Sequence, residues 1–248
     1  MRWSRYARSL VIGALLAAIL PDSTLAQNGT QNSSTQIVQP AAPLQPAPPA
    51  PALVMIDAAH GGSEPGAMLN PAVPEKDVTL VFARRLRQEL GSRGISTQII
   101  RDNDVTISAD QRAETVNSVH PVLYIAVHAS SLGTGVSIFA AMPFSWKDSR
   151  GPFVNWQAAQ AGSATKSLWA QQELASAIRK TGFPVRALLA PLRPLNNVNV
   201  PALAFEFAPT TGNVSQLTST DYQQMTCAAL ANAIAAVVPT LRSRTAAP

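Results

Sequence analysis

The feature that most constrains the fold is a regular alternation of short apolar runs and helix-periodic segments along residues 53–238. Five runs of apolar or β-branched residues are typical of buried strands: residues 53–57, 95–100, 122–127, 136–140 and 202–205. Helical segments separate most of these runs, and strands joined through helices pair in parallel. The alternation predicts an α/β fold, a single-domain three-layer sandwich in which helices flank a mostly parallel, twisted sheet.

The helix-periodic segments have recognisable ends. In the first of them apolar residues recur at every fourth position, namely Val78, Phe82, Leu86 and Leu90. That helix is expected to end at Gly91. Ser108 and Gln111 form a capping box for a second, shorter helix. Two further helices are expected at residues 168–178 and 221–238.

The first residues have the three parts of a secretory signal peptide. A basic start precedes an apolar run from Leu10 to Leu20 and a small-residue cleavage site after Ala26. The run is short compared with the ~20 residues that span a bilayer. Residues 1–26 are predicted to be a cleaved signal, and an uncleaved membrane anchor is the alternative. In both cases the rest is expected to be exported, to the periplasm or the extracellular part of the cell envelope.

Composition divides the remainder of the chain into three parts. Residues 27–51 are polar and end in Ala-Pro repeats, so a disordered linker is expected there. Residues 52–240 are expected to form the globular domain, followed by a flexible tail at 241–248. The single cysteine, Cys227, excludes an intramolecular disulfide and is expected to be a buried, small apolar residue.

The formal net charge of +5 and the pI of about 9.9 suit an anionic polymer or surface as a partner. Many of the basic residues lie near the two termini, however, and no stretch interleaves aromatic with basic side chains. No nucleic-acid partner is therefore expected.

Three polar side chains lie at the ends of predicted buried strands. His60, His128 and Glu206 each come soon after one of the apolar runs. Parallel strands of an open sheet present their carboxyl ends at the same edge, where ligands bind. The two imidazoles and the carboxylate are expected to converge there, although they are far apart in the sequence.

Imidazole nitrogens and carboxylate oxygens are zinc ligands, and a catalytic zinc site keeps one position for water. Two histidines and one carboxylate leave a net charge that can lower the pKa of a bound water toward ~7. Glu75, at the head of the first helix, and Glu206 both qualify as the third ligand. The other carboxylate would accept a proton, and the residue types alone do not decide between them.

Several motifs resemble those of the zinc-dependent N-acetylmuramoyl-L-alanine amidases. The family sequences Ile-Asp-Pro-Gly-His-Gly-Gly, Glu-Lys-Asp, Thr-Arg-Asp, Ser-Ile-His-Ala-Asn and Pro-Ala-Val-Leu-Val-Glu are similar to residues 56–62, 75–77, 100–102, 126–130 and 201–206. The resemblance covers about residues 53–238. It departs from the family at Ala58-Ala59 in place of Pro-Gly, at Ser130 in place of Asn and at Phe207-Ala208 in place of Gly-Phe.

The resemblance implies roles for four residues. His60, Glu75 and His128 would be the zinc ligands, and Glu206 would be the general base. The activity implied for residues 52–240 is hydrolysis of the amide between N-acetylmuramic acid and L-alanine in peptidoglycan, for cell-wall remodelling or daughter-cell separation. Peptidoglycan is the implied substrate, and a protein activator stays open as a further partner.

Two alternatives remain for the function. One is a non-catalytic peptidoglycan-binding or regulatory protein with the same fold, which would require the metal or the base to be missing. The other is a zinc peptidase that cuts a different amide. The residue types do not exclude the second alternative.

Other polar residues have two interpretations each. Asp57 would either accept a hydrogen bond from His60 or cap its own turn. Arg101 and Arg112 would either hold substrate carboxylates or pair with Asp102, Asp104 or Asp110. Arg193 and Asn196 are candidates for the wall of the cleft. Residues 141–166, where Asp148 is the acidic residue, are expected to form a loop that leaves the metal site open.

Overall fold

The computed structural model describes residues 52–142 and 156–246. Its centre is a six-stranded sheet with the order β4-β1-β5-β8-β6-β7. The strands are β1 (Leu53–Ala58), β4 (Ser96–Ile99), β5 (Leu123–Ala129), β6 (Gly135–Ala141), β7 (Val185–Ala190) and β8 (Ala202–Ala208). A small hairpin outside the sheet pairs β2 (Met68–Asn70) with β3 (Val73–Pro74).

Most of the sheet is parallel, as predicted. Strands β4, β1, β5 and β8 pair in parallel, and β6 runs antiparallel to β8. The edge strand β7 pairs in parallel with β6 and was not among the predicted strands. Every residue of β7 is at least partly exposed, so its sequence lacks the continuous apolar run that indicates a buried strand.

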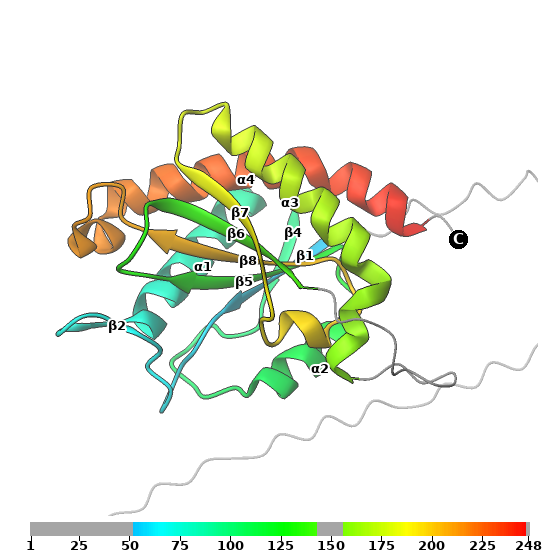
Figure 1. Ribbon diagram of the computed structural model, residues 1–248, viewed down its shortest axis with the longest axis horizontal. Coiled ribbons are helices and arrows are strands. Elements are labelled where there is room, and N and C mark those ends of the chain that lie inside the picture. The colour runs from blue at the N-terminus through cyan, green and yellow to red at the C-terminus, as the bar shows by residue number, and fades with distance from the viewer. Residues whose placement is uncertain (1–51, 143–155, 247–248) are drawn as a thin grey trace, which may run out of the picture. The chain divides into compact units, whose positions relative to one another are not determined.

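Helices cover both faces of the sheet, which confirms the three-layer architecture (Figure 1). The four α-helices are α1 (Glu75–Gly91), α2 (Ala109–Val119), α3 (Ala164–Arg179) and α4 (Thr220–Ala246). Helices α1, α3 and α4 pack on one face around the larger apolar core. Helix α2 and the 3₁₀ turn η3 (Leu195–Asn197) cover part of the opposite face.

Alternation along β8 shows how the two faces differ. Phe205 and Phe207 point into the larger core, where Phe207 stacks on Phe82 with 4.2 Å between ring centroids. Ala204 and Glu206 point to the face that carries α2, because successive side chains of a strand face opposite sides. The polar residue at the end of this strand therefore lies on the less covered face.

The predicted capping box of Ser108 and Gln111 is present at the start of α2. Cys227 is buried and free, as expected. Helix α4 continues past its expected end, so residues 241–246 are helical where a tail was expected, and Leu241 is buried. By length and composition α4 could cross a membrane, but half of that apolar window is buried against the rest of the domain.

The stretch at 141–166 is only partly a loop. Residues 156–163 form the 3₁₀ helix η2 (Trp156–Ser163), which leads into α3. Asp148 and the rest of 143–155 lie outside the described residues, so the expected open loop stays a prediction.

Candidate metal centre

His60 lies in the tight turn that follows β1. Its backbone has a left-handed φ of 63°, and Gly61 and Gly62 continue the turn with φ values of 127° and 59°. A Cβ atom on Gly61 would lie 2.4 Å from the carbonyl oxygen of Val105. Only glycine fits this close approach, which holds the turn against the segment that follows β4.

The buried side chain of Arg101 stabilises this turn through hydrogen bonds to its backbone. Its side chain is 1% exposed and donates hydrogen bonds to the carbonyl oxygens of Ala58 at 2.9 Å and Ala59 at 3.1 Å. It also donates to the carbonyl of Lys76 at 2.8 Å, in the first turn of α1. Arg101 therefore joins the turn to the helix, and neither predicted role, a substrate contact or an ion pair, is correct.

Arg112 also stabilises this turn. It pairs with the buried Asp57 carboxylate and donates to the carbonyl of His60 at 2.7 Å. Asp57 also accepts a hydrogen bond from the Tyr124 hydroxyl at 2.7 Å. Both predicted roles of Asp57 are therefore wrong, because its partners are Arg112 and Tyr124 rather than His60 or its own turn.

The three aspartates expected as arginine partners bind elsewhere. Asp102 pairs with residues of α1, Asp104 with Lys76, and Asp110 with Arg193. The predicted pairs with Arg101 and Arg112 are wrong because those two arginines are buried under the turn, where backbone carbonyls are available as acceptors.

Glu75, the first residue of α1, lies between the two predicted imidazoles. Its Oε2 is 3.1 Å from Nε2 of His60, and its Oε1 is 3.0 Å from Nδ1 of His128. The Glu75 side chain is 7% exposed, whereas those of His60 and His128 are 19% and 30% exposed. The three groups therefore converge on a site that solvent reaches from the histidine side.

The charge of Glu75 governs the electrostatics of this cluster. Burial acts to raise the pKa of Glu75, but hydrogen bonds from His128, His60 and the amide of Ala67 outweigh it and hold that pKa well below its ordinary range. The hydrogen bond to Glu75 raises the pKa of His60, against an opposing effect of burial. The carboxylate is thus kept ionised, as a metal ligand must be.

His60, Glu75 and His128 could hold a metal ion. One ligand atom from each lies within 4.8 Å of the others. Two imidazoles and one carboxylate are a ligand set of catalytic zinc sites, which leave a further position for water or substrate. The donor types, their proximity and the partial exposure of both histidines fit zinc.

Glu206 lies beside this cluster on the next strand. It is paired with His128 in the parallel register of β5 and β8, and its side chain is partly buried. Burial and the charge of Glu75 raise the pKa of Glu206, while His128 and Arg186 act in the opposite direction. Glu206 is outside the three-residue group that could hold a metal.

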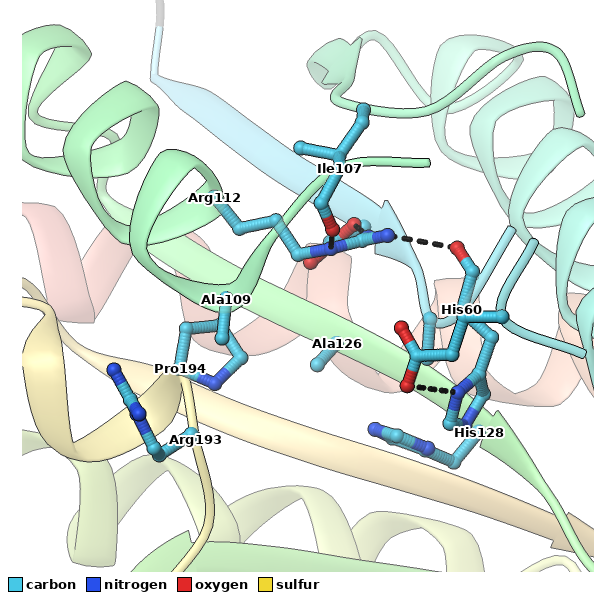
Figure 2. Close-up of a pocket in the computed structure, with 11 residues that line it drawn as sticks. His60, Ile107, Ala109, Arg112, Ala126, His128, Arg193 and Pro194 are labelled. Atoms are coloured by element: carbon cyan, nitrogen blue, oxygen red, sulfur yellow. Dashed lines mark hydrogen bonds and ion pairs between the residues drawn. The ribbon is translucent and has the colours of Figure 1, made fainter. Parts of the chain in front are cut away.

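A pocket extends from the two histidines along the face that carries α2. Figure 2 shows His60 and His128 at one end of it and Arg193 with Pro194 at the other, and Ile107, Ala109 and Ala126 line the space between. Arg193 therefore lines the cleft, as suggested by its position. Asn196 is buried and is not one of the residues lining this pocket.

Glu64 is a site residue that the sequence reasoning missed. Its carboxylate lies 3.1 Å from Nδ1 of His60, and its side chain is 61% exposed. An acidic residue four positions after a strand-end histidine was the available signal. The contact can fix the orientation of the imidazole and leave Nε2 directed at Glu75.

Comparison with known proteins agrees with this geometry. A family model described as N-acetylmuramoyl-L-alanine amidase matches residues 54–236. The N-acetylmuramoyl-L-alanine amidase AmiA of Salmonella typhimurium is 33% identical over 92 residues, which are 36% of this chain and 32% of that protein. The chain thus aligns with less than a third of that relative's length.

Two solved structures share the fold. The amidase Ami1 of Mycobacterium smegmatis has a TM-score of 0.60 at 20% identity, over 76% of this chain and 97% of that one. The CwlD amidase of Clostridioides difficile, in complex with the GerS lipoprotein, has a TM-score of 0.55 at 22% identity, over 76% and 99%. The match of the family model over most of the globular part shows that the chain belongs to the N-acetylmuramoyl-L-alanine amidase family.

Proposed function

We propose that this protein is a zinc-dependent N-acetylmuramoyl-L-alanine amidase that hydrolyses the amide between N-acetylmuramic acid and L-alanine in peptidoglycan. The observation that carries the proposal is the convergence of His60, Glu75 and His128, with Glu206 on the adjacent strand. Family membership supports the choice of bond.

The contacts support the ligand roles. His60, Glu75 and His128 would hold the ion, which supplies Lewis-acid polarisation of a carbonyl and a lowered pKa for water. Glu64 would orient the His60 ring. Arg101 and Arg112 donate hydrogen bonds to backbone carbonyls and keep the His60 turn in place, so the imidazole is positioned before any ligand binds.

Glu206 would move the proton. Its raised pKa makes it a stronger base than an exposed carboxylate, so it can accept a proton from the attacking water. The same carboxyl group can then donate that proton to the amine of the departing L-alanine. Glu75 is less suited to this task, because its pKa is lowered and its carboxylate would be a ligand of the ion.

Location and partners are part of the proposal. An export signal at residues 1–26 and a tether at 27–51 would deliver the domain to the cell envelope, where peptidoglycan lies. The C. difficile CwlD structure contains a lipoprotein, which supports a protein partner for this chain as well.

Digestion of purified peptidoglycan sacculi tests the activity. The zinc-loaded protein should release intact stem peptides that begin with alanine and leave the glycan strands uncut, as mass spectrometry would show. Peptides cut at another amide would replace the proposal with a peptidase. Binding to sacculi without any release would favour a non-catalytic role.

Elemental analysis tests the metal roles. The wild type should hold one zinc per chain, His60→Ala and His128→Ala should lose it, and Glu75→Gln should bind it more weakly. His120→Ala is the matched control, because His120 is the remaining histidine and is exposed at the end of α2. Retention of zinc by both histidine variants would remove the site from these residues.

A further inference from the structure

A row of four residues crosses the less covered face of the sheet. His128 pairs with Glu206, Glu206 with Ser137, and Ser137 with Arg186, across β5, β8, β6 and β7. Directly paired residues of neighbouring strands place their side chains on the same face. The row therefore leads from the metal cluster through the proposed base to an arginine on the edge strand.

The guanidinium of Arg186 is held over this row. Its Nη2 donates a hydrogen bond to Oγ of Ser137 at 3.1 Å. A Cβ atom on Gly133, in the turn between β5 and β6, would lie 2.9 Å from the same nitrogen. The guanidinium thus lies over β6, which is the neighbour of β8, the strand that carries Glu206. Neighbouring strands of a sheet are about 5 Å apart.

Three other cations around the site each have a carboxylate partner. Arg112 pairs with Asp57, Arg193 with Asp110, and Lys76 with Asp104. Within the part of the chain that the structure describes, Arg186 makes no ion pair with a carboxylate, and it is exposed to solvent. It remains available for an anionic group of a ligand.

We propose that Arg186 binds the free α-carboxylate of the second stem-peptide residue and so sets the peptide specificity of the enzyme. This proposal rests on the proposed amidase function. In stem peptides, D-glutamate is joined through its γ-carboxyl group, which leaves the α-carboxylate one residue beyond the scissile amide. One residue of extended chain spans about 3.8 Å. With the bonds of the carboxylate added, this group lies within reach of a guanidinium placed beside Glu206.

Apolar side chains continue the surface beside Arg186. In the adjoining row Ala204 pairs with Phe139, and Phe139 pairs with Leu188, which is 37% exposed. A peptide lying along this row would place its methyl groups on apolar carbon and its carboxylate at Arg186. The opposite direction, along the pocket toward Arg193, is then left for the glycan.

Two muropeptides that differ in one group test the proposal. The second stem residue is γ-linked D-glutamate in one and its amide, D-isoglutamine, in the other. A charge-assisted hydrogen bond supports a preference of about 10-fold in kcat/KM for the free acid. Arg186→Gln should reduce that ratio to about one by lowering the rate on the acid, and Arg186→Lys should retain part of the preference. Arg179→Gln, on the exposed end of α3, is the matched control and should keep the wild-type ratio.

Calorimetry on the metal-free protein supplies a readout that does not depend on turnover. The released stem peptide, in which the γ-carboxyl group of D-glutamate is bonded to the third residue, should bind more tightly than the same peptide with an α-amide, and Arg186→Gln should remove the difference. Equal wild-type kcat/KM for both muropeptides, or an equal loss on both in Arg186→Gln, would overturn the proposal, the latter because it indicates an effect on Glu206. Absence of any muropeptide cleavage by the wild type would instead count against the amidase function.

Discussion

The two faces of the central sheet are built from the same strands but serve different purposes. On one face Phe205, Phe207 and Val127 are fully buried under α1, α3 and α4. On the other face the alternate positions are Ala204, Glu206 and His128, and the covering layer is thinner. Consecutive residues of one strand thus belong to a close-packed core and to a partly exposed reactive site.

The difference shows where polar groups are tolerated. The buried polar residues of α3 and α4, such as Gln171 and Thr226, are neutral. The buried Asp57 carboxylate lies on the site face instead, where Arg112 and Tyr124 both bind it. Burying a charge is costly unless it is paired and hydrogen-bonded. The site face meets that requirement through specific contacts, so it should respond to mutation differently from the core face.

The sharpest test uses neighbours in β8, beginning with Glu206. Glu206→Gln should lower turnover on sacculi about 10²- to 10⁴-fold, the usual effect of losing a general base, and should leave zinc content unchanged. The urea midpoint should stay near that of the wild type, because the side chain is partly exposed and makes no buried ion pair among the described residues. If the variant loses zinc instead, Glu206 is a ligand and the roles of the two glutamates are reversed.

Phe207→Ala should have the opposite effects, a loss of stability without a loss of zinc. Removing a fully buried ring that stacks on Phe82 should cost about 3–5 kcal/mol of unfolding free energy. Folded molecules should still bind zinc, since the ring lies on the other face. Urea denaturation with parallel metal analysis measures both quantities, and loss of zinc by a variant that remains folded would break the separation of the two faces.

Two tyrosine-to-phenylalanine variants allow a hydrogen bond on one face to be compared with a hydrogen bond on the other. Tyr124→Phe removes a donor to the buried Asp57 carboxylate and should cost about 1.5–3 kcal/mol. Tyr222→Phe removes a donor to the neutral carbonyl of Ala208 on the core face and should cost about 0.5–1.5 kcal/mol. Equal costs in urea denaturation would show that the charge of Asp57 adds nothing to its bond.

The smallest expected effect is a pH dependence on the core face. Burial raises the pKa of Tyr222 from its ordinary value of 10.0 to about 12, and the neighbouring Thr226 side chain acts in the opposite direction. Because the folded pKa is the higher one, the stabilising contribution is complete below pH 10 and is lost as the pH rises through 12. The stability difference between wild type and Tyr222→Phe should therefore change in this range and be constant between pH 7 and 9. A constant difference up to pH 12 would contradict the raised pKa.

Much of the fold could be predicted because its strands are buried. The runs that became β1, β5 and β8 are continuously apolar, and the repeat of Val78, Phe82 and Leu86 marks one helix face. Strand β7 was missed because it is an exposed edge, where the sheet pairing rather than an apolar run determines the conformation. Arg186 was missed with it.

The candidate site was predicted in part. His60, His128 and Glu206 were expected to converge because parallel strands end at the same edge of a sheet, and the structure brings them to one edge. Residue type could not separate Glu75 from Glu206, since both are carboxylates. Only the packing of α1 against β5 places Glu75 between the two imidazoles.

The sequence by itself determined the α/β class, the positions of the buried strands and the types of group at their ends, because periodicity and residue chemistry are local properties. Tertiary structure decided which partner each polar group found. Arg101 and Arg112 became supports of the His60 turn, and Asp57 became the partner of Arg112 and Tyr124. Long polar side chains can reach many acceptors, and burial selects among them only once the strands and helices have packed.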